Sequence, residues 1–367
     1  MKRITTTLLV TAVLVGLTWL WPSSHAATRS VELQGPVMRA HFVNVGQANA
    51  TLLEFPCGVA LVDAGAQDDE HSDDLVDFIT SVFDARPELN STLEAVYVTH
   101  NHLDHNAALR AVAEKFKVKR YFDNGNLKGS GKPNTKWIRK NKNTEGRNIH
   151  VREIKDSAIP SPTDEGLTDD EIDPIQCADC DPKISILWAS PATRPEGWSK
   201  SDFKEENNHS LVIRVQFGAS TFLFPGDMQD AAIESLVERY EGKPTLDVDV
   251  LEVSHHGAEN GTTADLLEAL TPKIAVLSVG RADFGEDDPS DPMTTFAFGH
   301  PRRVTVDLLS SHIQVKRKKA VIRPLGIGQR EFRNRKVSKS IYATAWDGNI
   351  EVQADLAGML VVNMSNN

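Results

Sequence analysis

The stretch YVTHNHLDHNAAL, residues 97–109, places three histidines and one aspartate within six consecutive positions, directly after an apolar run. The run that leads into it, LEAVYV, is typical of a buried strand, and the following HNAALRAVAEKF has apolar residues at helical spacing. We therefore expect the cluster in a loop between the carboxyl end of a strand and a helix, where open α/β sheets place their sites. Imidazole and carboxylate groups are ligands of zinc, manganese and iron. The stretch thus predicts a metal site formed by His100, His102, Asp104 and His105.

Four donor side chains do not fill the coordination shells of two metal ions, and further candidates follow other predicted strands. Asp227 comes after STFLFPG, and its carboxylate could bridge two ions about 3.5–4 Å apart, as in two-metal hydrolases. His255 and His256 follow VDVLEVS, and His300 lies in FGHP. Taken singly, each of these residues is more often structural than a metal ligand. Together they predict a two-metal centre.

These motifs resemble those of the metallo-β-lactamase superfamily. The segment from His100 to His105 is similar to its HxHxDH signature, Asp63 in LVDAG to its early strand-end aspartate, and FPGD and SHHG to its later ligand motifs. Within the superfamily, the sequence most resembles the soluble hydrolase domain of DNA-internalisation competence proteins of the ComEC type. The resemblance covers residues 39–350 apart from residues 121–183, and its motifs are HFVNVGQANATLLEF, NNHSLVIRV, FLFPGDM, LEVSHHGAENGTT and FGHPRR.

The resemblance implies an α/β fold, an αββα sandwich of the metallo-β-lactamase type, with two divalent ions, Zn²⁺ or Mn²⁺, at one edge of the two sheets. It implies that His100 and His102 bind the first ion. Asp104 and His105 would bind the second ion, and Asp227 would bridge the two.

One histidine of the His255 and His256 pair would complete the second site. His255 is preferred because it is the first of the two to leave the strand. Asp63 would not bind metal, but would hydrogen-bond the histidine loop and orient its donors.

The sequence departs from the superfamily at the position of a third histidine for the first ion. Competence-type members have NN-x-S in this region, and here the text is NNHSLV, so that His209 occupies the variable position. Two alternatives stay open: His209 is a ligand, or it is a bystander beside Asn207 and Asn208. In the second case the first site is expected to be weaker, richer in water, or suited to manganese rather than zinc.

Two divalent ions would lower the pKa of a bridging water towards ~7, so hydrolysis would need no covalent protein nucleophile. Asp104 or Asp227 could accept the proton of the water. His300, beside Arg302 and Arg303, is a candidate to protonate the leaving group or to bind a phosphate. The alternative for His300 is a turn histidine without a catalytic role.

The charge distribution bears on the substrate. The net charge is −11, yet residues 115–147 contain eleven Lys or Arg against two acidic residues, and residues 302–339 contain twelve against two. These blocks are either solvated surface or basic walls for a phosphate-rich ligand. We therefore expect a phosphodiesterase or nuclease acting on DNA or RNA. The alternatives are a hydrolase of small phosphoesters, lactones or lactams, and a binding module without activity.

The first residues predict export. Lys2 and Arg3 precede an apolar run and the small-residue stretch SSHAA, which is the order of a signal peptide over residues 1–27. The alternative is a retained membrane anchor, and no other segment is apolar enough to span a membrane. The mature protein is then periplasmic or secreted, with one hydrolase domain over residues 30–367 and an insertion or long loop at 121–183.

Three cysteines allow one internal disulfide. Cys177 and Cys180, in CADC, are the expected pair because they are close in sequence, which leaves Cys57 as a free thiol.

Overall fold

The computed structural model describes residues 33–144, 146–161, 164–281, 294–328 and 331–365, which belong to one compact unit. The predicted signal peptide, residues 1–27, lies outside the described residues. Among the described residues, no helix combines the length and the apolar character needed to cross a lipid bilayer.

The larger of two main sheets has eight strands in the order β18-β17-β1-β2-β3-β5-β7-β8. Its amino-terminal strands form antiparallel pairs, whereas β3, β5, β7 and β8 are parallel. The carboxyl ends of these parallel strands therefore meet at one edge of the sheet. The strands are β1 (Val37–Phe42), β2 (Thr51–Phe55), β3 (Gly58–Val62), β5 (Ala95–Val98), β7 (Arg120–Asp123), β8 (His150–Glu153), β17 (Ile350–Asp355) and β18 (Leu360–Met364).

The second sheet has six strands in the order β16-β13-β12-β11-β10-β9. Its central pairs β11 with β12 and β12 with β13 are parallel, so their carboxyl ends also share an edge. The strands are β9 (Lys183–Trp188), β10 (Val212–Phe217), β11 (Ser220–Phe224), β12 (Val250–Glu252), β13 (Ile274–Leu277) and β16 (Ile341–Ala343).

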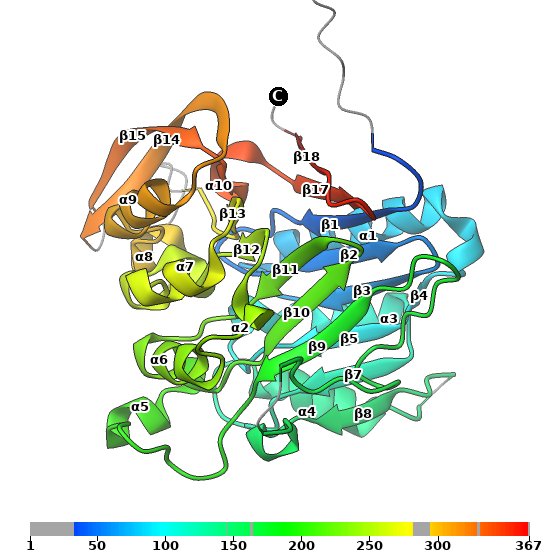
Figure 1. Cartoon of the computed structure of the whole chain (residues 1–367). Helices are drawn as coiled ribbons and strands as arrows, with labels where there is room; N and C mark the ends of the chain where they lie inside the picture. Colours follow the sequence, from blue (N-terminus) through cyan, green and yellow to red (C-terminus); the bar gives the residue numbers. More distant parts are fainter. Residues whose placement is uncertain (1–32, 145, 162–163, 282–293, 329–330, 366–367) are drawn as a thin grey trace, which may run out of the picture. The chain divides into compact units, whose positions relative to one another are not determined.

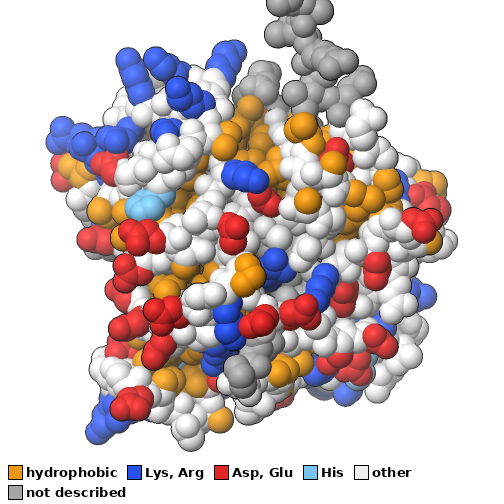
Figure 2. Space-filling view, viewed as in Figure 1, with side chains coloured by type: hydrophobic (Ala, Val, Ile, Leu, Met, Phe, Trp, Pro, Cys, Tyr) orange, Lys and Arg blue, Asp and Glu red, His pale blue; other side chains and the backbone are white. Residues whose placement is uncertain are grey.

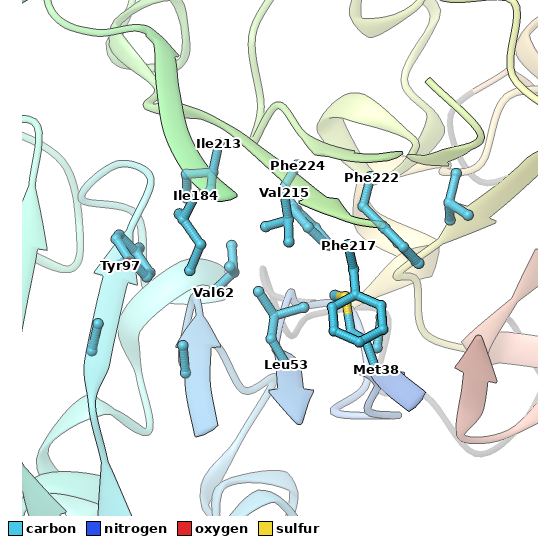
Figure 3. Packing of buried hydrophobic residues seen from close by; sticks show 14 of the residues in the cluster. Met38, Leu53, Val62, Tyr97, Ile184, Ile213, Val215, Phe217, Phe222 and Phe224 are labelled. Carbon is cyan, nitrogen blue, oxygen red and sulfur yellow. The ribbon is translucent and has the colours of Figure 1, made fainter. Parts of the chain in front are cut away.

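The central core lies between the two sheets (Figure 3). Ile213, Val215 and Phe217 of β10 point into it because successive side chains of a strand alternate between its faces. They face Leu53 and Val62 of the eight-stranded sheet, and each of these side chains is fully buried. Burial of one such side chain contributes about 1.5–3 kcal/mol, so this layer holds the sheets together.

Helices cover the outer face of each sheet (Figure 1). α1 begins after Asp68, whose side chain accepts a hydrogen bond from the backbone N–H of His71, and buries Leu75 and Ile79 against the eight-stranded sheet. The resulting four layers confirm the predicted αββα sandwich. The covering helices are α1 (Asp69–Ala85), α3 (Leu109–Lys115) and α4 (Lys132–Asn141) on one side, and α6 (Asp230–Arg239), α7 (Ala264–Leu270) and α9 (Arg303–His312) on the other.

Smaller elements connect these layers. β4 (Thr92–Leu93) pairs with β6 (Lys117–Val118), and β14 (Lys316–Gly328) pairs with β15 (Glu331–Lys339) as a long antiparallel hairpin beside α9. The short helices are α2 (Leu103–Asn106), α5 (Lys200–Lys204), α8 (Thr295–Phe298) and α10 (Thr344–Asp347), with 3-10 turns η1 (Pro87–Leu89), η2 (Asp156–Ala158), η3 (Glu206–His209), η4 (Pro244–Leu246), η5 (Ser254–Gly257) and η6 (Glu259–Gly261).

The segment at residues 121–183, which the sequence predicts as an insertion or long loop, contributes to both a sheet and the core. β7 and β8 extend the eight-stranded sheet and α4 packs on its outer face, while Ile154, Ile172 and Ile175 are buried between the sheets. These buried isoleucines lie in irregular chain outside the strands and helices. No strand or helix period therefore marks them in the sequence.

The expected pairing of Cys177 with Cys180 is wrong, because the disulfide joins Cys57 to Cys177 with their Cα atoms 5.3 Å apart. Cys180 is a buried free thiol. The reason is the packing of Ile175, whose side chain lies against Gly58 and so carries Cys177 to the turn between β2 and β3. This contact between distant segments outweighs closeness in sequence.

We predict that Cys57→Ser destabilises the protein by roughly 2–5 kcal/mol, because the crosslink closes a long loop in the unfolded chain. Urea unfolding measures the change, and Cys180→Ser is the matched control that retains the crosslink. Peptide mapping under non-reducing conditions that recovers a Cys177–Cys180 fragment from the wild-type protein would contradict the pairing.

Candidate metal centre

Four side chains from both sheets converge at the edge where the parallel strands end. Asp104 and His105 lie on α2 after β5, Asp227 follows β11, and His256 lies in η5 after β12. Each offers one ligand atom, and these four atoms all lie within 4.8 Å of one another. His105 Nε2 lies 3.0 Å from Asp227 Oδ1, and His256 Nε2 lies 3.4 Å from Asp104 Oδ2. Residues far apart in the sequence therefore form one compact donor group.

The chemistry of this group fits a divalent cation. The Nε2 atoms of His105 and His256 are buried and have no hydrogen-bond partner, although carboxylate oxygens lie close by. Buried polar atoms in proteins are normally hydrogen-bonded, so unpaired nitrogens need an explanation. Two imidazole and two carboxylate donors are a common ligand set of zinc and manganese. A cation bound here would satisfy all four.

Hydrogen bonds on the far side of each imidazole orient both histidines. His105 Nδ1 lies 2.7 Å from Asp63 Oδ2, and His256 Nδ1 lies 2.7 Å from the carbonyl oxygen of Ser278. A carbonyl oxygen can only accept, so the proton of His256 resides on Nδ1. Where Asp63 Oδ2 accepts from His105, the proton of His105 lies on Nδ1 in the same way. Both rings thus direct Nε2 towards the centre.

Asp63 is itself held by the strand end that carries the histidines. The backbone N–H of Thr99 donates to Asp63 Oδ1 at 2.7 Å, and the Thr99 hydroxyl donates to Oδ2 at 2.9 Å. Asp63 has a φ of 57° in the left-handed region, as do His255 at 51° and His256 at 52°. Such backbone is costly for non-glycine residues and persists where surrounding contacts enforce it, often at functional sites.

A second group of donors, His100 and His102, lies beside Asp227. His100 Nε2 lies 3.9 Å from Asp227 Oδ2 and 3.0 Å from His102 Nδ1. Burial, and the neighbouring His105 and His102, hold the pKa of His100 well below its usual range, so this imidazole is neutral and available as a donor. The structure therefore brings the four predicted residues of the 100–105 cluster and Asp227 together.

His209 is not part of either group. Its Nδ1 lies 2.9 Å from the Ser190 hydroxyl and its Nε2 lies 2.9 Å from the carbonyl oxygen of Phe203. Both ring nitrogens are thus engaged away from the centre, and the ligand alternative for His209 finds no support. Asn208 is likewise structural, since its side-chain oxygen accepts from the backbone of Gln229.

Asn207 is the residue of the NNH segment that faces the centre. Its Nδ2 lies 3.3 Å from His255 Nε2, and its Oδ1 is buried without a hydrogen-bond partner. His255 bonds Asn260 through Nδ1 and lies 3.9 Å from Asp227, outside the four-residue group that contains His256. The preference for His255 is therefore not supported. The left-handed backbone at both histidines turns the chain, so the second histidine points at the group.

A cavity of about 240 Å³ opens onto the donors. His300 lines it, and burial together with His255 and His256 lowers the pKa of His300 to about 3, so this imidazole is neutral. Arg302 does not line the cavity and instead precedes α9, with its backbone N–H donating to Gly257. The cavity is lined by Gln47, His102, Asp104, Ser130, Asn207, Asp227, His255, His256, Phe298 and His300.

Gln47 is a cavity residue that the sequence reasoning missed. Its Oε1 accepts a hydrogen bond from the Thr295 hydroxyl at 2.7 Å, and its buried Nε2 has no partner. Gln47 lies in an irregular loop after β1, where an amide residue has no distinguishing pattern. The motif HFVNVGQANATLLEF contained it, but nothing in the sequence set its amide apart from those of its neighbours.

Comparison with known proteins accords with this geometry. The sequence profile of the Metallo-beta-lactamase superfamily matches residues 43–281. The chain belongs to the metallo-β-lactamase superfamily. Members of this superfamily are generally metal-dependent hydrolases, and the donor group at residues 104, 105, 227 and 256 lies within the matched region.

Three curated relatives are competence or recombination proteins. The chain is 26% identical over 111 residues to ComE operon protein 3 of Bacillus subtilis, 38% over 78 residues to Recombination protein 2 of Haemophilus influenzae, and 31% over 108 residues to Competence protein ComA of Neisseria gonorrhoeae. These matches cover 30%, 21% and 29% of this chain, and 12%, 9% and 14% of the relatives.

Solved structures with similar folds have low sequence identity. The metallo-beta-lactamase fold protein YhfI from Bacillus subtilis is 10% identical with a TM-score of 0.42, covering 90% of this chain and 100% of that chain. Human tRNase Z, short form, is 15% identical with a TM-score of 0.35, covering 65% of this chain and 92% of that chain.

We predict that metal binding releases protons and strengthens as pH rises above 6.5, the ordinary pKa of histidine. Burial lowers the pKa of His105 and His256, but Asp227, with Asp63 or Asp104, outweighs it and raises both pKa values. The metal-free imidazoles hold protons that an ion must displace, so affinity is lost as pH falls.

Calorimetry in buffers of different ionisation enthalpy measures the released protons. His256→Ala should release fewer protons than the wild-type protein. An affinity for Zn²⁺ or Mn²⁺ that is independent of pH would contradict this account.

Proposed function

We propose that this protein is a phosphodiester hydrolase that uses two divalent ions, Zn²⁺ or Mn²⁺, to activate water. The observation that supports this most directly is the position of Asp227. Its Oδ1 faces His105, and its Oδ2 faces His256 and His100. A carboxylate within reach of a histidine of each donor group has the placement expected of a bridging ligand.

The chain's own groups would then have separate roles. His105, His256 and Asp104 would hold one ion, His100 and His102 the other, and Asp227 would hold both. When bound, the ions would lower the pKa of water towards ~7 and neutralise charge on a phosphoryl oxygen.

Proton transfer would fall to the buried carboxylates. Burial raises the pKa of Asp104, but the nearby imidazole of His256 and the charge of His105 outweigh it and hold the pKa well below the usual range. Ionised Asp104 or Asp227 can therefore accept the proton of the attacking water. Neutral His300 would orient the substrate through its ring nitrogens rather than attract it by charge.

The cavity supports a polar substrate more than a lactam or lactone. Gln47 and Asn207 present buried amide atoms without partners, and His300 Nδ1 is also buried without a partner. Gln47 Nε2 and a protonated His300 Nδ1 can donate to oxygens of a phosphoester, whereas Asn207 Oδ1 can only accept. Phe298 lines the same cavity and is 38% exposed, so its ring is available to stack on a base.

The basic hairpin supports nucleic acid as the substrate. Figure 2 shows Lys and Arg side chains gathered over β14 and β15. Lys318, Lys319 and Lys336 are exposed there, and none of them forms an ion pair with a described residue. The backbone N–H of Gly326 in β14 donates to Pro301, next to His300, so the hairpin adjoins the cavity. A strand held by the lysines could extend from the metal centre.

A second candidate, hydrolysis of small phosphoesters, is favoured by the lining of the cavity. No Lys or Arg is among the described residues that line it. In the first basic block, Arg139 pairs with Asp123 and Lys119 pairs with Glu94, so these cations are already neutralised. Exposed lysines remain on the hairpin and, in the first block, on α4 and at Lys115, Lys117 and Lys128.

Export also belongs to the proposal. We propose that residues 1–27 are a signal peptide and that the mature hydrolase domain, residues 30–367, is periplasmic or secreted. The Cys57–Cys177 disulfide supports this, because structural disulfides form mainly in oxidising compartments.

We predict that Asp104→Ala and His105→Ala each lower hydrolysis of bis(p-nitrophenyl) phosphate and linear DNA by roughly 100-fold or more while the protein stays folded. Turnover is measured with added Mn²⁺ or Zn²⁺, beside nitrocefin and a lactone as alternative substrates, and circular dichroism monitors folding. His150→Ala, which changes an exposed histidine on β8, is the control. An unaltered rate in either variant, or full activity in strong chelator, would rule out the mechanism.

We predict that the triple change Lys318→Gln, Lys319→Gln and Lys336→Gln weakens binding of single-stranded DNA and reduces the slope of log affinity against log salt by roughly 2. Hydrolysis of bis(p-nitrophenyl) phosphate should be unchanged, because these lysines lie outside the cavity.

The matched control removes three exposed lysines outside both basic blocks, by Lys200→Gln, Lys204→Gln and Lys273→Gln. Equal losses in both triple variants would show that the hairpin has no special role, and would favour the small-phosphoester candidate.

A further inference from the structure

Glu252, the last residue of β12, is an acidic side chain buried beneath the metal centre. It is 3% exposed, and no described Lys or Arg pairs with it. Its carboxylate accepts three hydrogen bonds instead, from Thr51 Oγ1 at 2.8 Å, Asn49 Nδ2 at 3.1 Å and Ser278 Oγ at 3.1 Å. Burial raises the pKa of Glu252 to about 7 in spite of these donors. Burying a carboxyl group without a cation is costly, so its partners need explanation.

On one side, Glu252 connects to the support of His105. The side-chain amide of Asn49 donates to Glu252 Oε2 and also to Asp63 Oδ2, at 3.2 Å. One NH₂ group has two hydrogens, one for each carboxylate, so the orientation of Asn49 is fixed by both. Asp63 in turn accepts from His105 Nδ1. The chain of contacts thus runs from Glu252 to His105, on the helix that follows β5 of the eight-stranded sheet.

On the other side, Glu252 connects to the support of His256. The Ser278 hydroxyl donates to Glu252 Oε1, and the carbonyl oxygen of the same Ser278 accepts from His256 Nδ1. Ser278 follows β13 of the six-stranded sheet, whereas Thr51 begins β2 of the eight-stranded sheet. Glu252 therefore bonds directly to residues of both sheets.

We propose that Glu252 is a positioning residue that couples the supports of His105 and His256 and so fixes the separation of their Nε2 atoms across the two sheets. This inference rests on the proposed function, because Glu252 acts through the metal centre. Glu252 does not line the cavity and touches no substrate. Its effect is on the geometry in which the two imidazoles meet one ion.

The alternative role, a hydrogen-bond bridge that only stabilises the sandwich, makes a different prediction. A stabilising bridge would change the free energy of unfolding and leave metal affinity alone. A positioning residue changes metal affinity and ligand geometry, because outer partners of ligand histidines affect affinity by about 10–100-fold. Metal uptake and the absorption spectrum of bound Co²⁺ separate the two.

The experiment compares substitutions of Glu252 in the full-length protein. Glu252→Leu removes every acceptor at similar volume and should lower Zn²⁺ affinity by about 10–100-fold and shift the Co²⁺ bands. Glu252→Gln should retain affinity to within about three-fold, because its oxygen can accept from Asn49 while its NH₂ donates to two hydroxyls that rotate. Unfolding in urea is measured for each variant.

The matched control is Asp249→Leu, which removes another buried carboxylate at the opposite end of the same strand. Asp249 accepts from Thr221 and pairs with Lys273, away from the metal centre. It should lose stability and keep the wild-type metal affinity and Co²⁺ spectrum. If Glu252→Leu does not fold, Ser278→Ala removes only the hydroxyl donor and should still weaken metal binding.

Several outcomes would overturn the inference. One is wild-type metal affinity in Glu252→Leu or, where that variant does not fold, in Ser278→Ala. Another is an equal loss of affinity in Asp249→Leu. If the wild-type protein hydrolyses a phosphodiester and Glu252→Leu binds metal normally, the inference fails and the proposed function stands. If the wild-type protein takes up no metal, both fail. A third case is that the wild-type protein binds metal, the Glu252→Leu variant binds it more weakly, and the wild-type protein hydrolyses no phosphodiester. Only the proposed function then fails.

Discussion

The burial of Asp227 among imidazoles is the constraint on which the site depends. Its carboxylate is 2% exposed and takes no arginine or lysine partner among the described residues. Burial raises its pKa, but the charges of His105 and His256 outweigh this and keep it ionised. A buried anion needs compensating charge, and here only histidines supply it. Each such histidine must then lose its proton before an ion can bind. The charge that balances Asp227 in the metal-free protein therefore also sets how metal affinity depends on pH.

Much of the site could be predicted because its residues occur at strand ends. The 100–105 cluster and Asp227 follow apolar runs, and the carboxyl ends of parallel strands meet at one edge. The choice between His255 and His256 could not be predicted, because it depends on left-handed backbone at both residues. The role of His209 could not be predicted either, because tertiary packing rather than sequence spacing places its partners Ser190 and Phe203.

The four-layer fold could be predicted from alternating strand and helix patterns together with the motifs, whereas the disulfide and the segment at 121–183 could not. In that segment Ile172 and Ile175 are buried in the core as isolated residues of irregular chain. The packing of Ile175 against Gly58 brings Cys177 to Cys57. Periodicity reports a face of a regular element, so it does not detect apolar residues that enter a core one at a time from irregular chain.

The same limit applies to Glu252, which a sequence reader would take for a surface residue at the end of a short strand. Its environment arises only when Asn49, just before β2, and Ser278, just after β13, both reach it. Apolar packing between two sheets tolerates small shifts of one sheet over the other. Hydrogen bonds do not tolerate them, since their strength falls steeply with misalignment. A buried polar network between the sheets therefore supplies the precision that an ion with ligands from both sheets requires.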